Sequence, residues 1–112
     1  MSSFFREQLP EPPYYAVIFS SLKKRIDSEY QATAEKMIEL AKTMPGFLGY
    51  ESISSELASI TISYWTDLES IANWKHHPDH LKAQERGKSE WYESYTIRIS
   101  RVESNHEFGR LF

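Results

Sequence analysis

The sequence predicts an α+β fold whose elements follow the order β-α-β-β-α-β. Four short segments are rich in aromatic and β-branched residues, as strands are. Two longer segments have apolar residues at helical spacing, and each opens with residues that typically cap helices. This order is that of the ferredoxin-like arrangement, an antiparallel four-stranded sheet with its helices on one face.

The chain has 112 residues, of which 40% are hydrophobic and 26% charged, and this suits one domain around one core. Three prolines, at positions 10, 12 and 13, predict that residues 1–13 form an extended arm. We expect the folded domain to span residues 14–103 and residues 104–112 to form a tail.

The first predicted strand covers residues 14–22 and is apolar on both faces, which is typical of a strand covered on both sides. Its faces carry, in alternation, Tyr15, Val17 and Phe19 and then Tyr14, Ala16 and Ile18. Because two helices cover only one face of such a sheet, a second copy of the same sheet is the simplest cover for the other face. The sequence therefore predicts a homodimer.

The first predicted helix begins at residues 28–31, where Ser28 opens a capping box. Its apolar stripe consists of Tyr30, Ala34, Met37, Ile38, Ala41 and Met44. Pro45 and Gly46 are expected to end it.

The next two predicted strands cover residues 47–54 and 59–65, with a turn over residues 55–58. In the later strand, Ile60, Ile62 and Tyr64 share one face, and Thr61 and Ser63 share the other.

The second helical segment is expected to be broken. A capping box over residues 66–69 predicts a helix that begins near Asp67. Its inward side is predicted to carry Leu68, Ile71 and Trp74. Pro78 suits the first position of a new helix, so we expect a break at His76 and His77 and a further helix from residue 78 to about residue 92. Residues 95–102 are the last predicted strand.

Composition argues against several classes of protein. A net charge of −3 does not favour nucleic-acid binding, which needs clustered Lys and Arg. The longest charge-free apolar run, residues 14–22, is far too short to span a membrane. We expect no signal peptide, because the first residues lack a basic start and a sustained apolar stretch. The absence of cysteine excludes disulfides and thiolate metal sites. We expect a cytoplasmic protein.

Three of the four histidines lie in the segment at the predicted helix break, residues 76–80. His76 and His80 have the i, i+4 spacing of a helical metal pair, but Pro78 lies between them and no third ligand has a fixed relation to the pair. His80 also has a suitable ordinary pKa, about 6.5, for a general base. The alternative is a surface histidine at the start of a helix.

Three stretches carry a resemblance to a known family. They are residues 44–52 (MPGFLGYES), 62–75 (ISYWTDLESIANWK) and 77–92 (HPDHLKAQERGKSEWY). They resemble the antibiotic biosynthesis monooxygenase (ABM) family over about residues 14–103. The resemblance implies a ferredoxin-like dimer whose sheets join as a dimeric α+β barrel.

The resemblance also implies two possible activities. Some members oxygenate phenolic or quinol-type molecules without flavin, metal or haem, and others degrade haem. The haem-degrading members have a helical Trp followed ten residues later by the His that ligates haem. Trp74 matches that Trp, but the residue ten positions on is Gln84, and an amide is a poor axial iron ligand. We therefore expect a monooxygenase with no cofactor, and keep haem degradation as an alternative.

Cofactor-free oxygenation needs a base of near-neutral pKa and an aromatic, water-poor cavity with polar groups that orient the substrate. We expect His80, or otherwise His76, to be the base. The expected substrate-binding residues are Trp74, Trp65 and Tyr64 as walls and Asn73 or Arg98 as orienting groups. The expected partner is a small hydrophobic or aromatic molecule. A non-catalytic or stress-associated dimer that binds such a molecule is the competing interpretation.

Overall fold

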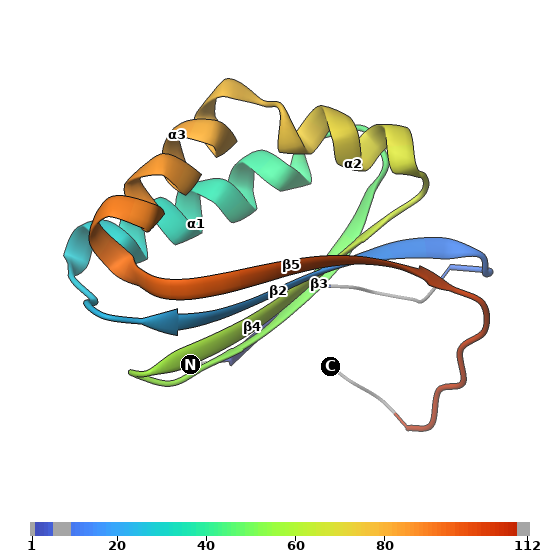
Figure 1. The fold of residues 1–112 in the computed structure, drawn as a ribbon. Helices are drawn as coiled ribbons and strands as arrows, with labels where there is room; N and C mark the ends of the chain where they lie inside the picture. Colours follow the sequence, from blue (N-terminus) through green and yellow to red (C-terminus); the bar gives the residue numbers. More distant parts are fainter. Residues whose placement is uncertain (1, 6–9, 110–112) are drawn as a thin grey trace.

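The computed structural model describes residues 2–5 and 10–109, with side chains described for residues 10–109. It confirms the predicted α+β, ferredoxin-like fold: one antiparallel sheet carries its helices on a single face (Figure 1). The strand order is β1-β3-β4-β2-β5. The elements are β1 (Ser2–Phe5), β2 (Tyr14–Lys23), α1 (Ser28–Lys42), β3 (Phe47–Ser54), β4 (Ala58–Trp65), α2 (Leu68–Lys75), α3 (Pro78–Arg86), the π-helical turn η1 (Gly87–Trp91) and β5 (Tyr92–Val102).

The sheet has one strand more than the four that the sequence predicts. Strand β1 pairs antiparallel with β3, from Ser2 opposite Ile53 to Phe5 opposite Tyr50. These residues belong to the segment predicted as an extended arm. The edge of β3 would otherwise present unpaired backbone N–H and C=O groups, and β1 covers it.

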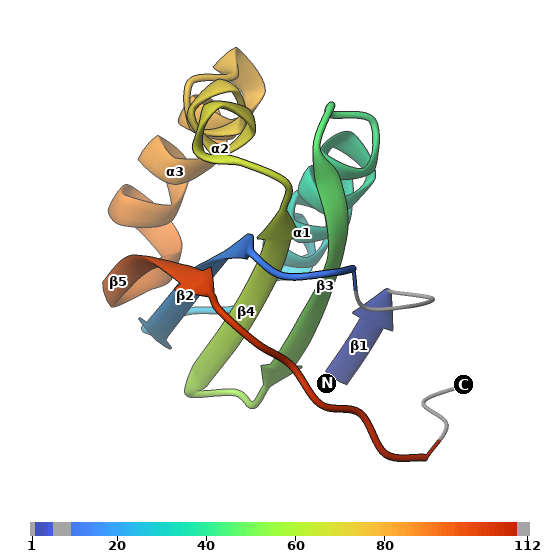
Figure 2. The same cartoon turned by 90° about the vertical axis from the view of Figure 1, so that its right-hand side faces the viewer.

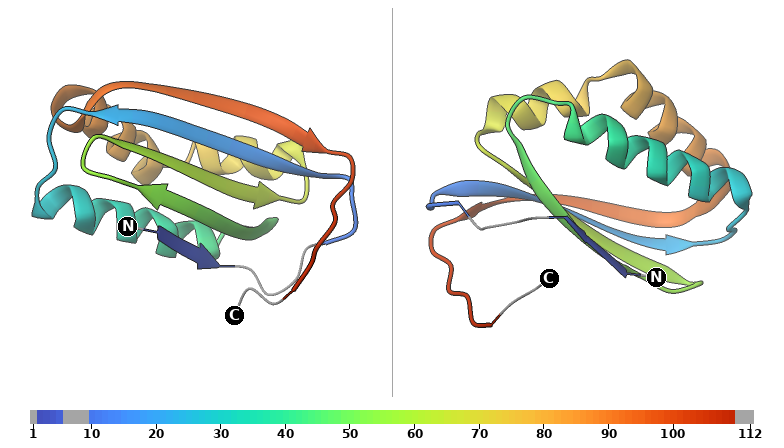
Figure 3. Two further views of the ribbon diagram at one scale, coloured as in Figure 1. Left: turned by 90° about the horizontal axis from the view of Figure 1, so that it is seen from below. Right: turned by 180° about the vertical axis from the view of Figure 1, so that it is seen from behind.

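Helix α1 lies above β3, whereas α3 lies above the β5 side of the sheet (Figure 2). Seen from the opposite side, the five strands lie next to one another with no described helix on that face (Figure 3). We call this second side the open face. In the described part of the chain, no helix is long and apolar enough to cross a membrane.

Aspartates cap the first two helices. Asp27, not Ser28 as predicted, caps α1, and its side chain accepts a hydrogen bond of 2.8 Å from the Tyr30 N–H. Asp67 caps α2 by accepting from the Ser70 N–H at 2.7 Å, so the predicted start near Asp67 is confirmed. In both cases the carboxylate satisfies an N–H that has no partner within the helix.

The predicted break at the histidines is also confirmed. His76 ends α2, and His77 caps α3 by accepting from the Asp79 N–H at 3.1 Å. Pro78 occupies the first turn of α3, where its missing N–H costs nothing. Helix α3 ends at Arg86, earlier than predicted, and the π-helical turn leads into β5, which begins three residues before its predicted start.

The core is centred on Trp65, whose side chain is fully buried. Ala41 from α1 and Ile71 and Trp74 from α2 pack around it. Leu68, predicted to point inward, is 54% exposed. It lies one turn before Ile71, and this short helix places only its later turns over the core.

Gly46 adopts a conformation that other residues avoid, with φ +86°. A Cβ there would also meet the Ser70 side chain and lie 2.8 Å from Thr66 Oγ1. We expect Gly46→Ala to lower the free energy of unfolding by more than about 1 kcal/mol, measured by urea denaturation. Gly109→Ala is the matched control, because Gly109 has a similar φ of +79° but no atom within 4 Å of the added Cβ. Equal, small effects of both substitutions would contradict this account.

Candidate functional site

A cavity of about 640 Å³ lies between the helices and the sheet face that they cover. This volume is in the range typical of small-molecule sites. Strands β2 to β5 supply its floor, and α1, α2, α3 and η1 supply its roof and walls.

The floor of the cavity is divided. On β2 and β5 it consists of the apolar side chains of Val17, Phe19, Ile97 and Ile99. On β3 and β4, beside Phe47 and Tyr50, it is lined by five serine and threonine residues, which we call the hydroxyl floor: Ser52, Ser54, Ser59, Thr61 and Ser63. The alternation of residues in the sequence predicts that Thr61 and Ser63 share one face, but the full set of five was not predicted. The sequence contains the pattern that would have predicted this set: Ser52 and Ser54 alternate with other residues in the preceding strand, as Thr61 and Ser63 do in theirs.

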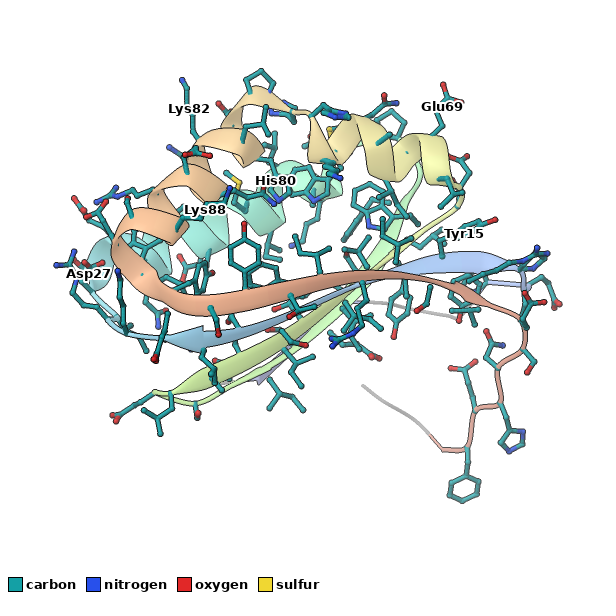
Figure 4. The ribbon with its side chains drawn as sticks, viewed as in Figure 1. Tyr15, Asp27, Glu69, His80, Lys82 and Lys88 are labelled. Carbon is teal, nitrogen blue, oxygen red and sulfur yellow. The ribbon has the colours of Figure 1, made fainter. Side chains whose placement is uncertain are left out.

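His80 and Trp74 form an aromatic stack at the cavity. Their ring centroids lie 4.3 Å apart with an interplanar angle of 23°, and Trp74 in turn stacks on Trp65 at 6.1 Å. Figure 4 shows the His80 side chain pointing from α3 toward the sheet. Its Nδ1 is buried and has no hydrogen-bond partner among the described residues. One nitrogen of the stacked imidazole is therefore buried without a hydrogen-bond partner, and the ring itself lines the cavity.

The environment of His80 favours its neutral form. Burial lowers the pKa of the imidazole below its ordinary value of 6.5. The backbone groups of Lys75 and Trp74 oppose this shift, and His77 adds to it. At neutral pH the ring is therefore uncharged and able to accept a proton.

Because the folded state disfavours protonated His80, the unfolded state binds more protons as the pH falls below about 6.5. We expect the free energy of unfolding to decrease between pH 7 and pH 5, and His80→Gln to flatten this slope. Urea titrations across that range measure both. Asp27 and Asp67, the capping residues, have lowered pKa values, caused first by the hydrogen bonds that their carboxylates accept from the backbone N–H groups of Tyr30 and Ser70. Their contribution to stability is therefore lost only below about pH 5. If the free energy of unfolding of His80→Gln fell with pH as steeply as that of the wild type, His80 would not be the group responsible for the pH dependence.

Four other residues expected at the site lie elsewhere. Trp65 faces the helices but is buried in the core behind Trp74. Tyr64 faces the open side of the sheet, where its hydroxyl donates to Glu51 at 3.0 Å. Arg98 is paired with Ile18 on that same open face, because side chains alternate along a strand. Asn73 is exposed on α2, one position and about 100° away from Trp74.

The alternative base, His76, is exposed, and its Nδ1 lies 2.9 Å from the Ala72 carbonyl oxygen. Of the histidines within residues 10–109, only His80 lines the cavity. In the same part of the chain, no three His, Asp or Glu side chains come together as a metal site. Gln84 lines the cavity about one turn after His80.

The end of the cavity below the start of α1 is aromatic. Tyr92 lies against Tyr30 at 6.0 Å and against Phe19 at 5.5 Å, and Phe19 stacks on Tyr95 at 5.2 Å. Burial, together with Tyr30, raises the pKa of Tyr92, so its hydroxyl stays protonated. The sequence analysis did not single out these tyrosines, because aromatic residues in strands and helices usually belong to the core.

Comparison with known proteins gives a consistent family assignment. The profile of the family described as "Antibiotic biosynthesis monooxygenase" matches residues 13–86. The uncharacterised protein YqjZ of Bacillus subtilis is 49% identical over 105 residues, covering 93% of this chain and 92% of that protein. Jasmonate monooxygenase ABM of Pyricularia oryzae is 30% identical over 93 residues, covering 79% of this chain but only 43% of that protein.

A solved structure extends the comparison of folds. SnoaB of Streptomyces nogalater, described as a cofactor-independent oxygenase, has a TM-score of 0.68 to this chain at 11% identity. The alignment covers 88% of this chain and 100% of SnoaB, and at this identity it shows the shared fold. Since the family profile spans more than half of the sequence, this chain belongs to the antibiotic biosynthesis monooxygenase family.

Proposed function

We propose that the protein is a cofactor-independent monooxygenase that acts on a small, electron-rich aromatic substrate of the phenol or quinol type. The observation that carries the proposal is the buried, unpartnered Nδ1 of His80, held by stacking on Trp74 at the cavity. The family assignment and the name of SnoaB, a cofactor-independent oxygenase, support it.

In this proposal His80 removes a proton from the substrate. The resulting anion is electron-rich enough to give one electron to dioxygen, and the two radicals combine as a peroxide. No external reductant takes part, so the substrate supplies all four electrons that reduce dioxygen. The peroxide forms on a ring carbon that carries a hydrogen. When the O–O bond breaks, that carbon loses its proton and becomes a carbonyl, and the deprotonated phenol oxygen becomes the second carbonyl of a quinone. The other oxygen atom leaves as water, which takes up the proton returned by His80 and the proton lost from the ring carbon.

The rest of the site fits this chemistry. The Trp74 ring and the apolar residues of β2 and β5 exclude water, which favours electron transfer over hydrolysis of intermediates. A neutral imidazole accepts a proton, whereas a protonated one does not, and the pKa of His80 is lowered. We propose Trp74 as a substrate-binding wall and His80 as the catalytic base.

The test is dioxygen consumption by purified protein from which metals and flavin have been removed, screened against quinols, phenols and haem. The proposal predicts consumption with at least one quinol or phenol. Ligand binding with no dioxygen consumption for any of these compounds would favour a non-catalytic binding protein. A haem Soret shift that is lost in His80→Ala would instead favour haem degradation.

We also propose that the protein is a homodimer joined through the open faces of its sheets. Leu22, Ile53 and Ile60 on this face are 51%, 63% and 50% exposed, although they are large and apolar. We expect sedimentation at micromolar concentration to show a dimer and Ile60→Asp to shift it toward monomer. A well-folded wild-type monomer at that concentration would contradict the proposal.

The tail is expected to add to this contact. Asn105 already accepts a hydrogen bond of 2.7 Å from Tyr14 on the open face, and Phe108 is 97% exposed. Leu111 and Phe112, at the end of the sequence, are also apolar and are expected to add to this contact, and they lie outside the described residues. Removal of residues 104–112 should weaken the dimer, and unchanged dimer stability would refute this addition.

A further inference from the structure

The hydroxyl floor is unusual for a sheet face that a layer of helices covers. Strand residues that face a layer of helices are normally apolar, as Val17 and Phe19 are on β2. The strand register places Thr61 between Phe19 and Ser52, so that an apolar residue and two hydroxyls share one row across three strands. The cavity floor therefore has an apolar part, formed by Val17, Phe19, Ile97 and Ile99, and a polar part formed by the serine and threonine residues of β3 and β4.

The hydroxyls of this floor retain hydrogen-bonding capacity. Ser52 Oγ and Thr61 Oγ1 are 2.8 Å apart, and Ser21 Oγ and Ser59 Oγ are also 2.8 Å apart. Each pair shares one hydrogen, so the second hydroxyl hydrogen of the pair can donate elsewhere and lone pairs remain. For Ser52 and Thr61, no other hydrogen bond to either oxygen occurs within the described chain. This pair can therefore both donate to a ligand and accept from it.

Charge narrows the class of ligand that such a floor recognises. The carboxylates and ammonium groups that line the cavity are on exposed residues at its margin: Glu35, Glu39, Lys42 and Lys75. None of the five floor residues carries a charge. Neutral hydroxyl or carbonyl oxygens can bond to these hydroxyls, whereas a carboxylate held at the floor would lose its hydration with no charged partner among the floor residues.

We infer that the floor is a recognition site for a neutral, oxygen-bearing edge of the substrate, with Ser52 and Thr61 as its specificity-determining residues. The apolar part of the same molecule lies over β2 and β5, on the side of the sheet covered by α3, which carries His80. The inference deepens the proposed function by restricting the substrate class, and it rests on that proposal only for the reaction, not for binding.

Binding without turnover tests it. Affinities are measured by calorimetry without dioxygen for three probes: naphthalene, a naphthalenediol with one hydroxyl on each ring, and the dimethyl ether of that diol. Wild-type protein should bind the diol about tenfold more tightly than the ether, because the ether lacks both hydroxyl donors of the diol. Thr61→Val and the double variant Ser52→Ala/Thr61→Val should remove most of this preference and leave the affinity for naphthalene unchanged.

Thr96→Val is the matched control, because Thr96 lies on a strand of the same sheet but faces the open side. It should retain the tenfold preference. The inference is overturned if Thr61→Val keeps the wild-type preference, or if wild-type protein binds none of the probes. If the binding inference is right but the proposed function is wrong, the result is different. The preference for the diol then depends on Ser52 and Thr61, yet the protein consumes dioxygen with none of the quinols or phenols.

Discussion

Replacing His80 by alanine should lower the turnover number of the oxygenase by about 10²–10⁴-fold, the usual range for loss of a general base. The substitution removes the one imidazole of residues 10–109 that lines the cavity, and with it the buried Nδ1. The affinity for an unreactive substrate analogue should change little, because the proton acceptor contributes to the transition state rather than to binding. Steady-state dioxygen consumption and analogue calorimetry measure the two effects.

His76→Ala is the matched control, since His76 is exposed and does not line the cavity. Its turnover number should equal that of the wild type.

Trp74→Ala should mainly weaken analogue binding, because it removes a wall of the cavity rather than a proton acceptor. In the wild type, the turnover number should fall at acidic pH as the imidazole becomes protonated. An undiminished turnover number in His80→Ala would remove His80 from the mechanism.

Replacing Trp65 by alanine should lower the free energy of unfolding by about 3–5 kcal/mol. The side chain is fully buried, packs edge-on against Phe47 at 5.3 Å, and stacks on Trp74. Its indole N–H donates to Ser63 Oγ at 2.9 Å, a bond that the substitution also removes. Urea denaturation measures the loss.

Trp65→Phe separates the two contributions, because it keeps an aromatic ring and loses only the donor and part of the volume. We expect a smaller loss for it than for Trp65→Ala. The Trp65 ring also supports Trp74, so the remaining folded Trp65→Ala protein should bind a substrate analogue more weakly. A loss below about 1 kcal/mol in Trp65→Ala would contradict its central place in the core.

The spacing of apolar residues and the positions of proline, glycine and capping residues predicted most of the fold. Proline at position 78 predicted the helix break, because its ring and missing N–H are incompatible with a helix interior. The N-cap predicted for α1, Ser28, lies one residue after the observed N-cap, Asp27, because both residue types are good caps. Strand β1 was missed because four residues beside several prolines give too short a pattern, and its pairing with β3 depends on the finished sheet.

The site was less predictable. His80 and Trp74 stay predicted site residues, and they meet at the cavity because both flank the break, one at the end of α2 and one at the start of α3. Tyr64 and Arg98 were placed at the site, yet alternation along a strand only separates two faces and does not tell which face the helices cover. The same ambiguity hid the hydroxyl floor, although the alternation in both strands was readable.

The central claim is that the protein oxygenates its substrate with dioxygen and no cofactor. The most direct measurement uses isotopically labelled dioxygen, metal-free and flavin-free protein, and a quinol or phenol identified by the consumption screen. The account predicts one labelled oxygen atom in the organic product and one in water, with His80→Ala losing most of both signals. Labelled hydrogen peroxide with no label in the organic product, or an equal yield from His80→Ala, would contradict it.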